Sequence, residues 1–363
     1  HPLDVGRVTG SSPVSRTMIT LGIETSCDET ALCLLETKEN TYRILGNIVH
    51  SQIDVHKEFG GVVPMLAKRE HLKNLPLLYT KILKDSGVEE SSINSIAVTA
   101  GPGLEPALWT GILFAQELGK RLSIPVQGVN HMEGHILASL IPDTSIDTTF
   151  KDLLALPLPA LALLISGGHT EIVKVNAVGS YEVIGKTKDD AVGEAFDKVA
   201  RMLQLPYPGG PEISKLAEKA RRENLPKVFT LPRPLLHSKD LLFSFSGLKT
   251  AVLYALQKHG EPNDAEKADL AREFEDAVTE VLITKVTQAL ETHAPETLIL
   301  GGGVIANTHI RKAFEELASS YRIPLLLPAL GLTGDNALMI ALTGNMQKAP
   351  TSFDIRASGN LSL

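Results

Sequence analysis

One order of strand-like and helix-like segments occurs twice in this 363-residue chain, and this repeat constrains its fold more than any other feature. Each half begins with three short apolar segments typical of hairpin-linked strands, and continues with helices and further strands. In the first half the expected strands are 19–24, 31–35, 42–50, 95–100 and 125–129, and the expected helices are 64–84 and 106–122. In the second half the expected strands are 161–165, 171–175, 181–185, 297–300 and 324–327, and the expected helices are 192–203, 213–222, 265–292 and 307–321.

The repeat predicts an α/β protein made of two related subdomains. Hairpins that lead into helix–strand units give mixed sheets flanked by helices. We expect residues 18–150 to form the first subdomain and residues 151–346 the second, with a leader at 1–17 and a tail at 347–363. The cleft between the two halves is then the expected ligand site.

Composition excludes several classes of protein. With 35 basic and 42 acidic residues the net charge is −7, which argues against broad nonspecific binding of nucleic acid but allows a local basic groove. No apolar run reaches the roughly 18 residues of a membrane span, so we expect no membrane association. The only cysteines are Cys27 and Cys33, which argues against a disulfide framework and fits a reducing compartment.

The first 17 residues carry Ser, Thr, Gly, Pro and two Arg with a single acid, and show no periodic pattern. Such a leader fits the remnant of a mitochondrial presequence, and it equally fits a disordered segment or a cloning remnant. We expect a mitochondrial location, with the bacterial cytoplasm as the alternative.

Two histidines four residues apart, His131 and His135, predict a metal site. Four residues are close to one helical turn, so both imidazoles project from one helix face. Glu133 lies two residues after the first histidine, which turns it to the far side of the helix and argues against a zinc-protease mechanism. Asp335 offers a third ligand, and two histidines with one carboxylate suit Zn or Fe(II).

Polar turns at corresponding places in the two halves, the second of them glycine-rich, indicate a nucleotide site. Residues 25–30 follow the first strand of the first half, and residues 166–170 follow the first strand of the second. Turns of this kind direct backbone N–H groups at an anion. A third segment, 301–307, runs from a strand through three glycines to Asn307, which is placed to cap a helix and donate to a ligand.

Two further segments of the second half are candidates for ligand contact. Asp197 lies one to two turns into an expected helix, within reach of a ribose hydroxyl or a substrate amine. The segment 207–211 contains Gly209 and Gly210 between prolines, which gives a rigid loop that a ligand approaches closely. Taken alone, both features are more often structural.

Several of these motifs together resemble a known family. They are residues 22–30, with Glu24, Thr25, Ser26, Cys27 and Asp28; His131-Met132-Glu133-Gly134-His135; Ser166-Gly167-Gly168-His169-Thr170; and Gly301-Gly302-Gly303-Val304 with Asn307. In this order they resemble the universal tRNA threonylcarbamoyladenosine (t6A) synthesis transferases, once called O-sialoglycoprotein endopeptidases. The resemblance runs from about residue 18 to about residue 346.

The resemblance implies a fold and an activity. The fold is that of actin, Hsp70 and the sugar kinases, with two subdomains around a central nucleotide cleft. The activity is transfer of a threonylcarbamoyl group from threonylcarbamoyl-AMP to N6 of adenosine 37 in tRNAs that read codons starting with A. The implied partners are the tRNA anticodon loop, a separate synthase that supplies the adenylate, and a second copy of the chain in a homodimer.

The resemblance also assigns site residues. His131, His135 and Asp335 would hold one divalent metal, Zn or Fe. The adenylate, or ATP, would be bound by Ile165, Ser166, Gly167, Gly168, His169, Asp197, Gly209, Gly210 and Asn307. Glu24 and Asp28 face the cleft if the fold is right, and either is placed to accept the amine proton.

Two positions indicate the branch of the family. Leu164 stands where the archaeal and cytosolic members carry a metal-ligating tyrosine, so that fourth ligand does not carry over. His169 stands where those members carry an asparagine. Both differences point to the bacterial and organellar branch.

Two other functions compete with this one. A small-molecule kinase of the same fold would need a catalytic aspartate over a sugar or acetate pocket, and would not need His131 or His135. A nonenzymatic tRNA-binding scaffold would tolerate loss of His135 but not loss of the basic clusters at residues 68–73 and 215–227.

Overall fold

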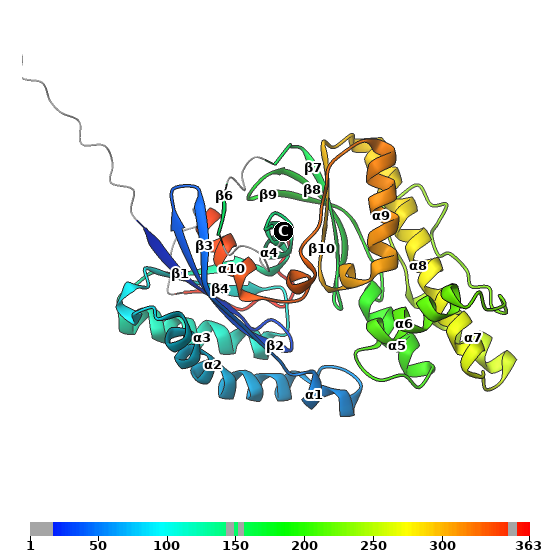
Figure 1. Ribbon diagram of the computed structural model, residues 1–363, viewed down its shortest axis with the longest axis horizontal. Helices are drawn as coiled ribbons and strands as arrows, with labels where there is room; N and C mark the ends of the chain where they lie inside the picture. Colours follow the sequence, from blue (N-terminus) through cyan, green and yellow to red (C-terminus); the bar gives the residue numbers. More distant parts are fainter. Residues whose placement is uncertain (1–16, 143–148, 152–155, 348–353) are drawn as a thin grey trace, which may run out of the picture.

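The computed structural model describes residues 17–142, 149–151, 156–347 and 354–363, and contains two mixed β-sheets with helices around them (Figure 1). The first sheet has the order β5-β4-β1-β2-β3-β6 and the second has the order β11-β10-β7-β8-β9. The strands of the first sheet are β1 (Met18–Glu24), β2 (Glu29–Lys38), β3 (Thr41–Ser51), β4 (Ser95–Gly101), β5 (Val126–Asn130) and β6 (Thr149–Lys151). Those of the second are β7 (Ala160–Ile165), β8 (Thr170–Ala177), β9 (Ser180–Lys186), β10 (Thr297–Gly301) and β11 (Leu325–Leu326).

The two sheets share one topology, as the repeat predicts. In the first, β1 pairs antiparallel with β2 and parallel with β4, and β4 pairs parallel with β5. In the second, β7 pairs antiparallel with β8 and parallel with β10, and β10 pairs parallel with β11. Strands β1 to β5 therefore correspond one by one to β7 to β11, and the predicted duplicated α/β fold is confirmed.

The helices flank both sheets. They are α1 (Ile53–His56), α2 (Pro64–Ser86), α3 (Glu105–Leu122), α4 (His131–Ala138), α5 (Val192–Met202), α6 (Gly209–Arg222), α7 (Ser246–His259), α8 (Asp264–His293), α9 (Thr308–Tyr321) and α10 (Ala337–Met346), with short 3-10 segments at Lys57–Phe59, Glu90–Ser92, Gly303–Ala306 and Leu330–Leu332. Every strand and helix expected from the segment pattern is present. The largest difference in a boundary is at α6, which begins at Gly209 rather than at residue 213.

Strand β2 shows why the first sheet forms between two layers of helices. Leu32 and Leu34 point to one side, into the core that α2 and α3 complete, and Ala31, Cys33 and Leu35 point to the other, against α10. Because successive strand residues face opposite sides, a strand buried on both faces has a continuous apolar sequence. In the second sheet α5 to α9 cover one face, while Met132 and Ile136 of α4 pack on the other.

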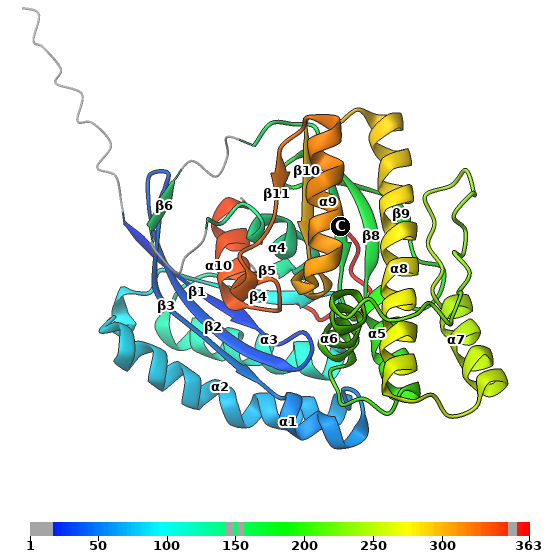
Figure 2. The same cartoon turned by 45° about the vertical axis from the view of Figure 1, so that its right-hand side comes forward.

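Helices α4 and α10 consequently lie between the two sheets (Figures 1 and 2). Helix α10 comes from the far end of the chain but packs against β1 at Gly22, where an added Cβ would lie 2.3 Å from the carbonyl oxygen of Ala337. At its other end Gly344 packs against Ala97 of β4. The expected division of the chain near residue 150 stays a prediction, but the packing of α10 means that the first core takes residues from both halves of the sequence.

The last described segment also returns to the first sheet. Ile355 packs into the core beside α3, and the backbone N–H of Ser358 donates to the carbonyl of Ala100 at 2.9 Å. The expected leader lies outside the described residues, apart from residue 17. Among the described residues, none of the helices is both long enough and apolar enough to cross a bilayer.

Candidate active site

Helix α4 begins at the first of the two predicted metal-ligating histidines. The side chain of Asn130 caps it, accepting the backbone N–H groups of Met132 at 2.8 Å and Glu133 at 3.4 Å. This cap fixes the first helical residue at His131. The rings of His131 and His135 then lie on one face, with centroids 4.7 Å apart, as their spacing predicts.

The third predicted ligand meets them from the loop before α10. Oδ1 of Asp335 lies 3.3 Å from Nε2 of His131 and 3.2 Å from Nε2 of His135. The neighbouring Asn336 caps α10 through Met339 N at 3.0 Å, which fixes the loop that carries Asp335. The structure therefore brings all three predicted ligands together, with their ligand atoms within 4.8 Å of one another.

The three side chains fit a divalent metal. Nε2 of His135 is buried and, within the described part of the chain, its 3.2 Å contact with Oδ1 of Asp335 lacks the geometry of a hydrogen bond. A buried ring nitrogen in that state needs a partner, and two imidazoles with one carboxylate are a donor set typical of Zn and Fe(II). Burial alone would raise the pKa of Asp335, but the two histidines outweigh it and hold that pKa far below its usual value.

Glu24, predicted as a proton acceptor, lies behind the first histidine and not in an open cleft. Its side chain is fully buried, and Oε2 lies 2.9 Å from Nδ1 of His131. Thr99 Oγ1 donates to the same oxygen at 2.6 Å, and the backbone N–H of Ser26 donates to Oε1. Burial would raise the pKa of Glu24, but His131 and Thr99 lower it overall, so the carboxylate is placed to orient the imidazole.

Asp28 follows on the same turn, beside an acid that the sequence did not single out. The side chain of Asp28 is 8% exposed. Burial and the neighbouring charges of Asp28 and Asp335 raise the pKa of Glu29 to about 10. The only signal in the sequence was the adjacency of the two acids.

The turn 166–169 lies next to the metal ligands. Oγ of Ser166 accepts the N–H groups of Gly168 at 3.3 Å and His169 at 3.1 Å, which holds the turn in shape. Ile165 is buried at the end of β7. Burial, together with the charges of His131 and His135, lowers the pKa of His169 to about 4, so this ring is neutral at pH 7.

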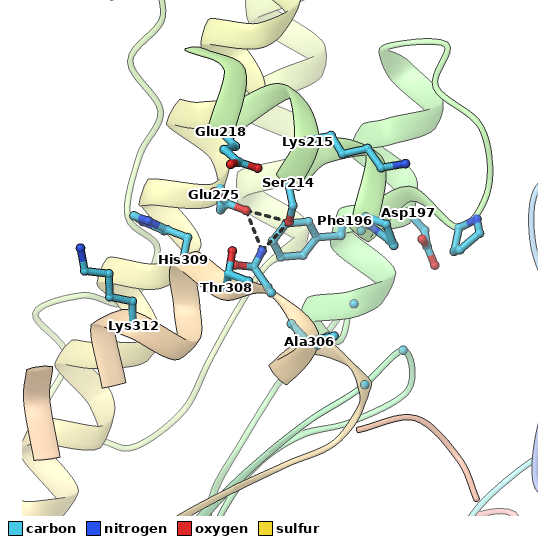
Figure 3. A pocket seen from close by; sticks show the side chains of 18 of the residues that line it. Phe196, Asp197, Ser214, Lys215, Glu218, Glu275, Ala306, Thr308, His309 and Lys312 are labelled. Atoms are coloured by element: carbon cyan, nitrogen blue, oxygen red, sulfur yellow. Dashed lines mark hydrogen bonds between the residues drawn. The ribbon is translucent and has the colours of Figure 1, made fainter. Parts of the chain in front are cut away.

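A cavity of about 760 Å³ opens on the other side of this turn, among α5, α6, α8 and α9 (Figure 3). Four of the predicted ligand-binding residues line it, namely Gly167, Asp197, Gly210 and Asn307. The predicted Gly209 is buried, and its N–H donates to Oδ1 of Asp197 at 2.7 Å. Asp197 therefore holds the start of α6 against α5.

Asn307 caps α9 as predicted, and its amide also joins a network that the sequence did not reveal. Its Oδ1 accepts Ile310 N at 3.0 Å, and its Nδ2 donates to Ser214 Oγ at 2.7 Å and to Glu275 Oε1 at 2.6 Å. Figure 3 shows Ser214 and Glu275 pointing toward one another, with Ser214 donating to the same oxygen at 2.9 Å. Arg221 pairs with the other oxygen of Glu275, which completes this wall.

Asp276 and His309 form the outer continuation of the same wall. Nε2 of His309 lies 3.2 Å from Oδ1 of Asp276, which also pairs with Arg221. Burial would raise the pKa of Asp276, but His309 and Arg221 lower it to about 2. These residues come from α6, α8 and α9, which lie far apart in the sequence, so no local motif could have found them.

Comparison with known proteins agrees with this arrangement. Residues 43–342 match the family model described as tRNA N6-adenosine threonylcarbamoyltransferase. A protein of that name from Thermosipho africanus is 47% identical over 90% of this chain and 93% of its own length. One from Polynucleobacter asymbioticus is 45% identical over 94% and 96%, and one from Nitrosomonas europaea is 43% identical over 95% and 97%.

Solved structures agree on the fold. HypF of T. kodakarensis superposes with a TM-score of 0.54 at 14% identity, over 91% of this chain and 47% of that chain. This likeness concerns the fold alone, which is the predicted fold of actin, Hsp70 and the sugar kinases. The relatives do not favour the alternative of a small-molecule kinase. The chain belongs to the tRNA N6-adenosine threonylcarbamoyltransferase family and is a transferase.

Proposed function

We propose that this chain transfers the threonylcarbamoyl group of threonylcarbamoyl-AMP to N6 of adenosine 37 in tRNAs that read codons starting with A. One observation carries the proposal. Gly167 of the turn 166–169 lines the cavity, and the charges of His131 and His135 lower the pKa of His169 on the same turn, so this turn connects the cavity to the three metal ligands. An adenylate in the cavity therefore has its reactive end beside the three ligands.

The cavity supplies the contacts that an adenylate needs. Helices α6 and α9 both begin at it, with Gly210 and Thr308 in its lining, and the positive ends of helix dipoles stabilise phosphate. Apolar groups such as Phe196 and Val304 offer surface for a base. The substrate would then be held with its phosphate at the glycine turns.

His131, His135 and Asp335 would hold the metal. When bound, the metal supplies Lewis-acid stabilisation of charge on the substrate's carbonyl or carboxylate oxygens. The chain's own residues position the donor, which matters because an exocyclic adenine amine is a poor nucleophile. N6 attacks the carbamoyl carbon, the bond from that carbon to the phosphate oxygen breaks, and AMP leaves.

The proton lost by N6 needs an acceptor, and we assign that role to Asp28. Of the two predicted acceptors, Glu24 is fully buried and has both oxygens engaged by His131, Thr99 and Ser26. Asp28 lies on the same turn, and its side chain pairs with that of Glu29 rather than with a metal ligand. Glu24 thus becomes a positioning residue, and Asp28 the general base.

The proposal includes partners and a location. The adenylate comes from a separate synthase, the tRNA offers its anticodon loop, where a base is accessible without melting a duplex, and two copies of the chain form a homodimer. The proposal takes mitochondrial tRNA as the substrate, with the bacterial cytoplasm as the alternative location; the two Arg and single acid of residues 1–17 favour the first.

The test is direct transfer. Purified protein loaded with Zn or Fe is incubated with synthetic threonylcarbamoyl-AMP and an unmodified tRNA that carries A37, and the digested tRNA is analysed for t6A by mass spectrometry. We expect t6A, its loss in His135→Ala and with chelator, and none on a tRNA with G37. If no t6A forms with folded, metal-loaded protein, even after bacterial accessory proteins are added, the proposal is wrong.

A further inference from the structure

Glu133 lies between the two histidines on α4, yet it points away from them. Its side chain is 2% exposed. Oε1 accepts a hydrogen bond from the hydroxyl of Tyr181 at 2.8 Å, and Oε2 accepts one from Nε2 of Gln347. A carboxylate buried this deeply is stable only when both oxygens have donors, so this pair of contacts is a built arrangement.

The two donors come from different parts of the fold. Tyr181 belongs to β9 of the second sheet, and Gln347 directly follows α10. Oε1 of Gln347 in turn accepts from Nε2 of Gln127 on β5 of the first sheet, at 3.5 Å. Hydrogen bonds that begin at Glu133 therefore connect helix α4 to both sheets and to the end of α10.

Helices α4 and α10 are also the two elements that bring the metal ligands together. Asp335 lies just before α10, and Gln347 lies just after it, so α10 is held at both ends. Between these ends α10 packs closely on α4, because an added Cβ on Gly134 would lie 3.1 Å from Met339 Cγ. A shift of α10 at Gln347 would be carried along a rigid helix of about 15 Å to Asp335.

We propose that Glu133 is a positioning residue of the metal site. With Tyr181 and Gln347 it fixes α4 against α10, so that Nε2 of His131 and Nε2 of His135 both face Asp335. It touches no reacting group, and its role is to set the geometry of ligands that it does not contact. This inference rests on the proposed metal site, but not on the identity of the transferred group.

Co²⁺ titration of the full chain tests it, because the visible absorption of Co²⁺ reports the geometry of its ligands. Tyr181→Phe and Gln347→Leu each remove one donor to Glu133. We expect each to weaken Co²⁺ binding about 10-fold and to change the visible bands. Tyr321→Phe is the matched control, because Tyr321 is a surface residue whose hydroxyl donates to Glu291. Thermal unfolding shows whether each variant is folded. If Tyr181→Phe is unfolded, Gln347→Leu alone provides the test.

The outcomes separate this inference from the proposed function. Variants that bind Co²⁺ with wild-type affinity and wild-type bands would overturn the role of Glu133. Wild-type protein that binds no Co²⁺ at one equivalent would overturn both the metal site and this inference. Weakened binding in the variants, with a wild type that forms no t6A, would support the role of Glu133 while contradicting the proposed reaction.

Discussion

Nδ1 of His131 lies 2.9 Å from Oε2 of Glu24, so the imidazole is held by a carboxylate on the side opposite to Asp335. Such a contact fixes the tautomer, with the proton on Nδ1 and the lone pair of Nε2 directed toward the ligand site. The acid that the sequence offered as a catalytic base is thereby committed to orienting a ligand.

Replacing Glu24 should weaken metal binding more than it destabilises the fold. Glu24→Gln keeps the size of the side chain but removes the charge that orients His131, and we expect Zn²⁺ affinity to fall about 10- to 100-fold. Competition with a chromophoric chelator measures it. Glu29→Gln is the control on the same turn, because the side chain of Glu29 pairs with Asp28 and Ser51 rather than with a metal ligand. Equal affinities in the two variants would contradict the orienting role.

The wall around Asn307 should control nucleotide affinity independently of the metal. Glu275→Ala removes the acceptor shared by Ser214 and Asn307 and leaves Arg221 paired with Asp276. A lost buried network of this kind costs about 1–3 kcal/mol, so AMP binding measured by calorimetry should weaken about 10-fold. Glu218→Ala is the matched control, because Glu218 lies one helical turn after Ser214 on α6 and also lines the cavity. If both variants bind AMP like the wild type, the base of the nucleotide lies elsewhere.

The free energy of unfolding should decrease at acidic pH because of His71, a buried histidine outside the metal site. His71 is fully buried, with Nδ1 2.8 Å from Thr30 Oγ1 and Nε2 3.0 Å from the carbonyl of Cys27. Burial lowers its pKa, although the Cys27 carbonyl and the charges of Glu24 and Asp28 oppose this. Below pH about 6.5 the unfolded chain therefore binds a proton that the folded chain does not, and the free energy of unfolding decreases as pH falls.

Denaturant unfolding at pH 7.5 and 5.5 measures this effect. The loss assigned to His71 should approach about 1 kcal/mol at pH 5.5 and should be smaller in His71→Gln. His50→Gln, at an exposed histidine, should keep the wild-type loss. A pH dependence that is the same in all three proteins would contradict the assignment.

Much of the fold was predictable because its signals are local. Hairpin-linked strands and amphipathic helices such as α5 and α9 can be recognised within short windows of sequence. Helix α10 was missed because all residues from Ala337 to Thr343 are buried, so no polar face marks its period. The same burial places it between the sheets, where it carries Asp335 to the histidines.

In the candidate site, too, the residues set by local structure could be predicted, and those brought together by packing could not. His131 and His135 could be predicted because a single helix turn sets their distance, and Asn307 because a cap is a local feature. Ser214 and Glu275 meet Asn307 from segments 93 and 32 residues away, and only the packing of α6, α8 and α9 brings them together. Glu24 was found as an acid on the right turn, but its role depends on His131, 107 residues further along the chain.

The close approach of α10 to β1 should make Gly22 intolerant of any side chain. In Gly22→Ala the new Cβ would lie 2.3 Å from the carbonyl oxygen of Ala337 and 2.8 Å from Ala341 N, and both are backbone atoms that cannot rotate away. Overpacking of this kind costs about 1–3 kcal/mol, and the displaced helix would take Asp335 with it. We therefore expect lower thermal stability together with weaker Zn²⁺ binding. Gly247→Ala is the matched control, since nothing lies within 4 Å of its added Cβ and alanine favours helix α7. Wild-type Zn²⁺ affinity in a destabilised Gly22→Ala would show that Asp335 is positioned independently of the contact between α10 and β1.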